Sequence, residues 1–220
     1  MANDSAAGGG LFGLFPQNTN TYALNYLSDK YGQAFSYLGP WGDSMTGTRS
    51  FLASCDTLPG QRILVQVKDF KDKDNRVVLD NYLACRYAED TVDFIRACAK
   101  DTLGAVNVYY EPALLPLSAD LPADATFERF LSEGGTYLSM TVEVKASAWQ
   151  NEEQARAFAE RVANTGVSGS LNLIAVKDEQ FGTLTWDQLK DKIALRDYAR
   201  YALASCSEGS CRLSYREGTA

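Results

Sequence analysis

Short segments in which apolar and polar residues alternate recur along this chain and constrain its fold more than any other feature. The clearest is 136–146, TYLSMTVEVKA, whose apolar residues all fall on one face: Leu138, Met140, Val142 and Val144. A two-residue period is typical of a strand that buries one side. Further strands are expected at 49–56, 62–70, 105–112 and 170–178, with a closing hairpin over 196–217.

Segments with helical periodicity separate these strands. They lie at 19–35, about 80–100, a short stretch capped near Asp124 or Thr126, 151–166 and 185–193. Strands interleaved with helices in this irregular order favour a single α+β domain over residues 20–220, with a mixed or mainly antiparallel sheet packed against helices. A doubly wound nucleotide-binding fold is not expected, because no glycine-rich phosphate motif follows a strand.

The composition narrows the classes of partner. The 220 residues are 45% hydrophobic and 22% charged, which is typical of a globular protein. The formal net charge of −7 argues against nucleic acid, whose binding relies on Lys and Arg. No apolar run reaches the ~18 residues of a transmembrane helix, so no span is expected.

The N-terminal segment 1–19 is expected to be a flexible tether, because it is rich in Asn, Ser, Ala and Gly. One explanation is that a natural signal, with a lipid anchor upstream of Met1, has been removed. The alternative is a natural disordered N-terminus. The first explanation predicts an extracytoplasmic protein that is secreted or attached to the cell envelope.

The five cysteines support the same compartment. Cys206 and Cys211 flank a Ser-Glu-Gly-Ser turn, and a hairpin there would place them opposite each other at disulfide distance. Cys55 is expected to pair with Cys85, which leaves Cys98 as a buried thiol. The alternative is five reduced cysteines in a cytosolic protein.

Two segments, TYALNYLSDKYGQAFSYLGP and DNYLACRYAED, carry a resemblance. They resemble uncharacterised secreted proteins or lipoproteins of Gram-positive bacteria, in which a helix ending in Tyr-Gly precedes strands and a Tyr-rich helix. The resemblance covers about the first 100 residues. It implies an extracytoplasmic location and no particular chemistry.

Nucleophilic catalysis is not expected, although WGDSMTGT at 41–48 resembles the Gly-Asp-Ser block of GDSL esterases. That family activates its serine with a histidine, and this chain contains none. Ser44 and Asp43 are therefore interpreted as turn residues. The lack of histidine also weakens transition-metal sites, and Asp69, Asp72 and Asp74 do not complete a calcium loop. No catalytic residue, metal or cofactor is predicted.

Carboxylates offer the remaining route to an enzyme. Glu111 and Glu143 follow or lie in neighbouring strands, so the pair could form a glycosidase-like cleft between sheet and helices. The leading hypothesis is instead a non-catalytic, envelope-tethered domain that binds an unknown protein or glycan partner. Its candidate binding residues are aromatic, because such side chains combine apolar area with a polar group: Trp41, Tyr109, Tyr110 and Trp149.

Overall fold

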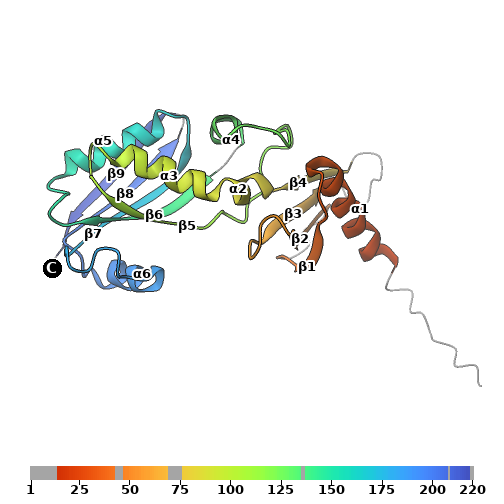
Figure 1. Ribbon diagram of the computed structural model, residues 1–220, viewed down its shortest axis with the longest axis horizontal. Helices are drawn as coiled ribbons and strands as arrows, with labels where there is room; N and C mark the ends of the chain where they lie inside the picture. Colours follow the sequence, from red (N-terminus) through yellow and green to blue (C-terminus); the bar gives the residue numbers. More distant parts are fainter. Residues whose placement is uncertain (1–13, 43–46, 69–75, 135–136, 208, 219–220) are drawn as a thin grey trace, which may run out of the picture. The chain divides into compact units, whose positions relative to one another are not determined.

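The computed structural model describes residues 14–42, 47–68, 76–134, 137–207 and 209–218 (Figure 1). The chain divides into two compact units, Met1–Asp80 and Asn81–Ala220. Each combines helical structure with a largely or wholly antiparallel sheet, so the predicted α+β class is confirmed, with two sheets where one was expected. Two compact units can belong to one folding domain or to two, and the single domain over 20–220 stays a prediction.

The first unit is a four-stranded antiparallel meander with one helix. Its elements are α1 (Leu14–Tyr31), β1 (Ser36–Pro40), β2 (Thr48–Ser54), β3 (Ile63–Lys68) and β4 (Val77–Asp80), and the strands pair in the order β1-β2-β3-β4. The strands expected at 49–56 and 62–70 form β2 and β3, and they pair with Phe51 opposite Val65. Helix α1 begins inside the segment expected to be a tether. Pro16 is compatible with this start, because the first turn of a helix needs no backbone N–H.

A buried carboxylate joins α1 to β4 in this unit. The Asp80 side chain is only 2% exposed and accepts from Lys30 Nζ at 3.2 Å and from Tyr31 OH at 2.8 Å. A charge this deeply buried is tolerated only when it is paired and hydrogen-bonded. The two helix residues therefore fix the end of α1 against the edge strand.

Several sequence predictions fall outside the described residues. The Gly-Asp-Ser turn with Asp43 and Ser44 lies there, as does the charged hairpin tip with Asp69, Asp72 and Asp74. The same holds for the tether residues 1–13.

The second unit is larger and has helices on both faces of a five-stranded sheet. Its helices are α2 (Tyr82–Arg86), α3 (Ala88–Ala99), α4 (Phe127–Glu133), α5 (Glu152–Ala163) and α6 (Trp186–Leu195). Its strands are β5 (Val106–Tyr110), β6 (Tyr137–Lys145), β7 (Ser168–Val176), β8 (Arg200–Ser207) and β9 (Ser210–Glu217). They pair in sequence order, and only β6 and β7, which α5 connects, are parallel. The helix expected over about 80–100 is interrupted at Tyr87, where α2 ends and α3 starts.

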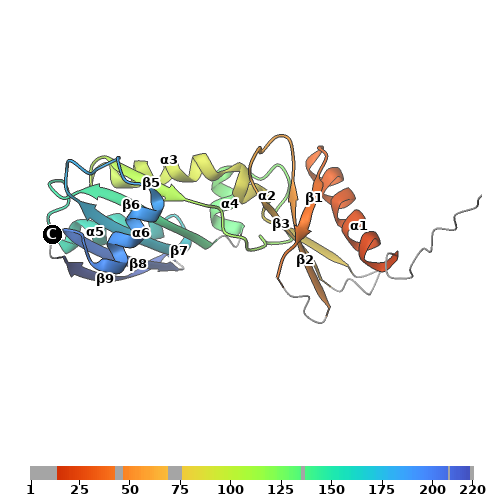
Figure 2. The ribbon, with the colours of Figure 1, turned by 90° about the horizontal axis from the view of Figure 1, so that it is seen from below.

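The alternation of β6 decides which residues lie on which face. Leu138, Met140, Val142 and Val144 are all buried, on the face that α3 and α5 cover (Figures 1 and 2). The opposite face carries α6, which packs through Leu189 on a small cluster with Ile174 and Tyr198. Helix α6 covers only part of that face, and Tyr137 and Leu203 are exposed on it. One face of the sheet is therefore core, and the other is available for a site.

The helix boundaries follow their capping residues. Asn151 accepts a hydrogen bond from Gln154 N, as expected from its position before α5. Thr126 caps α4 in the same way, and Thr185 forms a complete capping box with Gln188 at the start of α6. Each cap satisfies a backbone N–H that the helix itself leaves without a partner.

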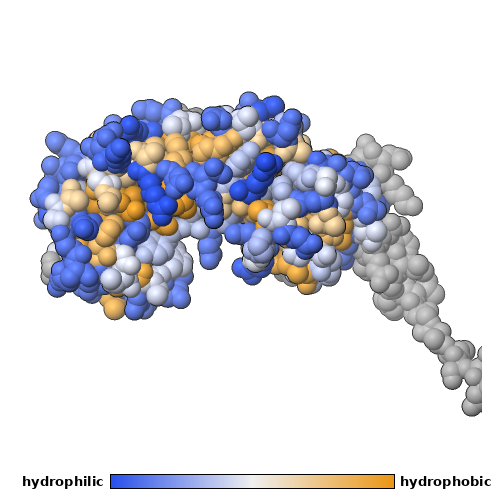
Figure 3. Space-filling view, viewed as in Figure 1, coloured by the Kyte–Doolittle hydropathy of each residue, from blue (hydrophilic) through white to orange (hydrophobic). Residues whose placement is uncertain are grey.

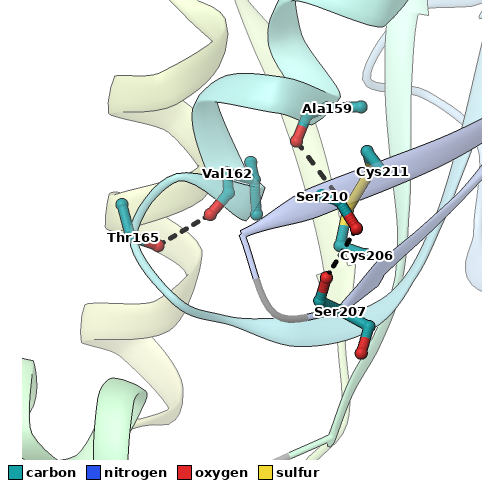
Figure 4. Close-up of a disulfide and its surroundings, with 7 residues drawn as sticks. All are labelled: Ala159, Val162, Thr165, Cys206, Ser207, Ser210 and Cys211. Carbon is teal, nitrogen blue, oxygen red and sulfur yellow. Dashed lines mark hydrogen bonds between the residues drawn. A yellow bond between two sulfur atoms is a disulfide. The ribbon is translucent and has the colours of Figure 1, made fainter.

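The closing hairpin forms as the sequence predicted. Cys206 lies directly opposite Cys211 in the β8–β9 register, and their Cα atoms are 4.3 Å apart and joined through a disulfide (Figure 4). Ser210 Oγ donates to Ser207 O across the turn, and Cys206 Sγ lies 3.7 Å from the Ala159 carbonyl oxygen of α5. The disulfide thus closes the hairpin beside the helix that covers it.

Candidate binding site

A cavity of about 470 Å³ lies beside β5, in the second unit. Its walls come from three separate parts of the chain: β5 with the residues that follow it, β6, and the first turn of α6. They include Tyr109, Tyr110, Glu111, Ala113, Ser139 and Trp186. The volume is within the range of about 300–1,000 Å³ that is usual for small-molecule sites.

Two stacked aromatic rings contribute to the apolar lining of this cavity, together with Val108 and Ala113. Tyr109 and Trp186 are stacked, with ring centroids 5.9 Å apart and planes inclined by 15°. At this separation the rings are offset, so each leaves part of its face uncovered by the other. Lys190 Nζ lies 4.9 Å from the Trp186 ring centroid and is held by Asp187 at 2.9 Å. The indole thus contacts Tyr109 of β5 and Lys190 of its own helix, α6.

Glu143 connects β5, which carries Tyr109, to the loop before α6, the helix that begins with Trp186. Its side chain is fully buried and accepts from Asn107 Nδ2 at 2.9 Å and from Gly182 N at 3.3 Å. Tyr109 OH is 3.3 Å from the same carboxylate and donates to Leu184 O at 2.8 Å. These contacts fasten the loop that leads into α6 onto the sheet, so Glu143 positions both aromatic residues.

Gly182 makes the contact with Glu143 possible. Its φ of 76° is in the left-handed region, which side chains other than glycine rarely adopt. A Cβ atom there would also lie 3.2 Å from Asn107 Nδ2, the group that donates to Glu143. The loop therefore depends on glycine at this position for both its backbone and its packing.

The environment of Tyr109 keeps its phenol protonated. Burial, and then the neighbouring Glu143 carboxylate, raise the pKa of Tyr109 to about 12. The hydroxyl is consequently a hydrogen-bond donor at neutral pH, as its contact with the Leu184 carbonyl requires. Its role is to hold the ring, since both neighbours of the hydroxyl belong to the protein.

Hydroxyl groups extend from the cavity across the sheet. Ser139 lines the cavity, and Ser170 Oγ on the next strand lies 3.4 Å from Ser139 Oγ. Ser205 pairs with Ser170 in register on the strand after that. Thr141, opposite Tyr109 in the strand register, is fully buried, and its Oγ1 has no hydrogen-bond partner among the described residues.

The structure brings three of the sequence-predicted residues together. Tyr109, Tyr110 and Glu111 all line the cavity. Successive residues of a strand point to opposite faces, so the Tyr110 ring lies on the α3 side, where it also borders a hollow with Val92 and Arg96. Its hydroxyl is buried and has no hydrogen-bond partner in the part of the chain that the structure describes, and burial raises the pKa of Tyr110 well above its usual range. Tyr109 is the one of the two that stacks on Trp186.

The other two predicted aromatic residues lie elsewhere. Trp149 is a core residue: its ring is fully buried, contacts Tyr215 edge-on and donates from Nε1 to Asn151 O at 2.7 Å. Its ring therefore has no exposed surface with which to contact a ligand. Trp41 follows β1 in the first unit, where it is 39% exposed and its backbone N–H donates to Ser50 O. Its role as an anchor stays a prediction.

The two predicted disulfides have different outcomes. The Cys206–Cys211 bridge is present. Cys55 is buried in the first unit and Cys85 in the second, so their pairing stays a prediction. Cys98 is buried, as expected, and burial raises the pKa of its thiol.

Sequence reasoning missed Trp186, Ser139 and Thr141. Trp186 was assigned only to a short helix, although Thr185 and Gln188 already marked it as that helix's first residue. Its partner Tyr109 is distant in sequence, and no local pattern connects the two. The polar residues that alternate with the apolar ones in β6 did indicate which face of the sheet carries the site.

No family model, curated protein or solved structure matches this chain. Across the described residues, no group of three or more His, Cys, Asp and Glu side chains is placed to hold a metal ion. A search of the same residues found no helix with both the length and the apolar character needed to cross a bilayer.

Proposed function

We propose that the second unit is a non-catalytic binding module whose cavity takes a saccharide. The observation that carries this proposal is the offset Tyr109–Trp186 pair beside hydroxyl and carboxylate groups of Ser139 and Glu111. A sugar ring has an apolar C–H face bordered by hydroxyl groups. An aromatic surface packs well against the C–H face, and hydrogen-bonding side chains bind the hydroxyl groups.

The open part of the sheet supports a ligand larger than one sugar. Ser139, Ser170 and Ser205 follow one another across three neighbouring strands, which are about 4.8 Å apart. The hydroxyl row therefore extends about 10 Å from the cavity. Such a row suits a linear oligosaccharide that starts at the aromatic pair and crosses β6, β7 and β8.

The position of the carboxylates favours binding over hydrolysis. Glu143 pairs with Asn107, and Glu111 lies four residues further along the β5 segment, which corresponds to about 13 Å of strand. Glycosidases place their two carboxyl groups about 5–10 Å apart. Glu143 is also enclosed by its own hydrogen-bond donors, whereas Glu111 is exposed. The carboxylate hydrolase stays the alternative, and saccharide turnover is its test.

The proposal includes an extracytoplasmic location with attachment to the cell envelope. The Cys206–Cys211 bridge supports it, because disulfides persist mainly in oxidising compartments. The test is the intact mass after purification in excess alkylating reagent, compared with a reduced and alkylated sample. Trapping of Cys206 and Cys211 as thiols in protein taken directly from its native cells would contradict it.

The binding proposal is tested by screening the protein on an array of soluble oligosaccharides, followed by calorimetry of any ligand found. Trp186→Ala should abolish binding, and Ser139→Phe should block the cavity from an exposed strand position. Glu111→Gln should weaken binding through the loss of one acceptor charge. Trp41→Ala, the matched change of an exposed tryptophan in the first unit, should leave it unchanged.

Two results would contradict the proposal. One is the absence of any saccharide ligand for a protein that remains folded. The other is a ligand whose affinity is unaffected by Trp186→Ala and Ser139→Phe. Cleavage of the saccharide that stops in Glu111→Gln would favour the hydrolase instead.

A further inference from the structure

A second hollow of about 510 Å³ lies between α3, α4 and the residue Thr165 that follows α5. Its apolar lining consists of Phe94 and Ala97 from α3 and of Phe127 and Leu131 from α4. Figure 3 shows hydrophobic residues gathered over α3 beside α4, bordered by hydrophilic ones. We call this hollow the α3–α4 groove.

The groove exists because α3 has two apolar stripes. One stripe, with Ile95, Cys98 and Ala99, is buried on the sheet. The other carries Phe94 and Ala97, and it is covered only at one end, where Phe94 meets the edge of the Phe127 ring at a centroid distance of 6.2 Å. Ala97 remains exposed. An apolar stripe left open on a helix is a feature of surfaces that receive another helix.

The charged side chains among the described lining residues of the groove are all acidic. Asp90, Asp93 and Glu128 line it, and none of its lining residues is cationic. Asp93 shares an exposed ion pair with Arg96, whereas no salt bridge to Asp90 or Glu128 occurs among the described residues. Hydrogen bonds from its own backbone N–H and from Thr126 hold the pKa of Glu128 below its usual range. The rim is therefore anionic at neutral pH.

We propose that the α3–α4 groove binds a cationic amphipathic helix of a protein partner. Large apolar side chains of the partner would occupy the space between Phe94, Phe127 and Leu131, and flanking Lys or Arg would face Asp90 and Glu128. The small Ala97 lets the partner's backbone approach α3 closely. This site is separate from the saccharide cavity, and either can fail without the other.

The test uses a fluorescent Leu-Lys peptide of about 14 residues, four helical turns, with leucines on one face. The matched probe carries Glu at every Lys position. Fluorescence anisotropy with the full chain should show binding of the cationic probe and none of the anionic one. The affinity should fall with added salt, since exposed charges are screened.

Three variants locate the site. Ala97→Arg puts a long cation into the groove at an exposed helix position that tolerates arginine, and it should reduce the affinity more than 10-fold. Asp90→Asn with Glu128→Gln should reduce it about 3- to 10-fold. Asp191→Asn with Glu179→Gln removes the same charge from exposed positions outside the groove and should have less than a 2-fold effect.

Equal binding of both peptides would overturn the proposal, because the rim charges would then contribute nothing. So would cationic binding that survives Ala97→Arg, or that falls equally in the two double variants, since the net charge of −7 alone would explain it. Failure of both probes to bind the folded protein would overturn it as well.

Discussion

At the residue scale, Glu143 is the side chain on which the candidate site depends, although it does not line the cavity. It is fully buried and gathers donors from β5 and from the loop before α6. That carboxylate joins the Gly182 backbone to the sheet and lies beside the Tyr109 hydroxyl. The two glutamates that sequence reasoning treated as equivalent therefore differ: Glu143 supports the wall, and Glu111 forms part of it.

Exchanging each glutamate for glutamine tests this difference. We expect Glu143→Gln to lower the free energy of unfolding by about 1–3 kcal/mol, because it weakens hydrogen bonds to a buried charge. Glu111→Gln, at an exposed position, should stay within about 0.5 kcal/mol of the parent. Urea denaturation measures both values. Equal effects of the two changes would remove the structural role assigned to Glu143.

Thr141 carries a second residue-scale expectation. Its buried Oγ1 has no hydrogen-bond partner within the described ranges, and an unsatisfied buried hydroxyl costs about 1–3 kcal/mol. Thr141→Val has nearly the same shape and should leave the unbound protein as stable as the parent or more so. Urea denaturation of parent and variant measures the difference. A marked loss of stability would show that the hydroxyl is already satisfied.

The raised pKa of Tyr109 predicts a pH dependence with a definite sign. The folded state holds the phenol proton more tightly than the unfolded state, whose tyrosine pKa is about 10. The corresponding stability is therefore complete below pH ~10 and is lost as the pH rises towards the folded value of about 12. Tyr109→Phe should unfold less steeply over this window, as followed by circular dichroism. Identical profiles would mean that other groups control alkaline unfolding.

At the scale of elements, the β8–β9 hairpin is closed by a disulfide bond. Cys206 and Cys211 are five residues apart, so their bridge closes a short loop. The chain-entropy model gives about 2 kcal/mol for such a loop. We expect Cys206→Ser with Cys211→Ser to lower the free energy of unfolding by that amount under non-reducing conditions. Equal stabilities of parent and variant would show that the bridge does not constrain the unfolded chain.

Elements with strong local signals were predictable, and those defined by distant contacts were not. The alternation of apolar and polar residues in β6 and the capping residues of α4 and α5 are local sequence patterns, and each of these elements forms where it was expected. Strand β1 was missed because Ser36–Pro40 contains Gly and Pro, has little buried surface and depends on pairing with β2. Strand β4 was not predicted because it has only four residues and directly follows a charged segment.

The candidate site shows the same limit. Tyr109, Tyr110 and Glu111 are adjacent in sequence, so their aromatic and acidic character was visible at once. Trp186 reaches Tyr109 only because the loop after β7 folds back over β6 and is held by Glu143. Conversely, Trp149 was a candidate binding residue for its aromatic character alone, yet its ring is fully buried and in T-shaped contact with Tyr215 of β9. Both outcomes depend on contacts made across the sheet.

At the scale of the whole molecule, the chain combines two α+β units with separate sheets and cores. The second unit carries two surfaces of different chemistry: a cavity with aromatic and hydroxyl groups, and an apolar groove with an acidic rim. The first favours a sugar and the second a cationic protein segment. We therefore propose an adaptor that joins a glycan to a protein, and the sugar site is the central claim of this proposal.

The most direct test of that claim is fluorine NMR of protein labelled with fluorotryptophan, titrated with a soluble oligosaccharide found on the array. The chain has three tryptophans, and single substitutions assign their resonances. The account predicts that the Trp186 signal shifts progressively to saturation, while those of Trp41 and Trp149 stay in place. A signal from Trp186 that remains fixed at saturating ligand, or a shift confined to Trp41, would contradict it.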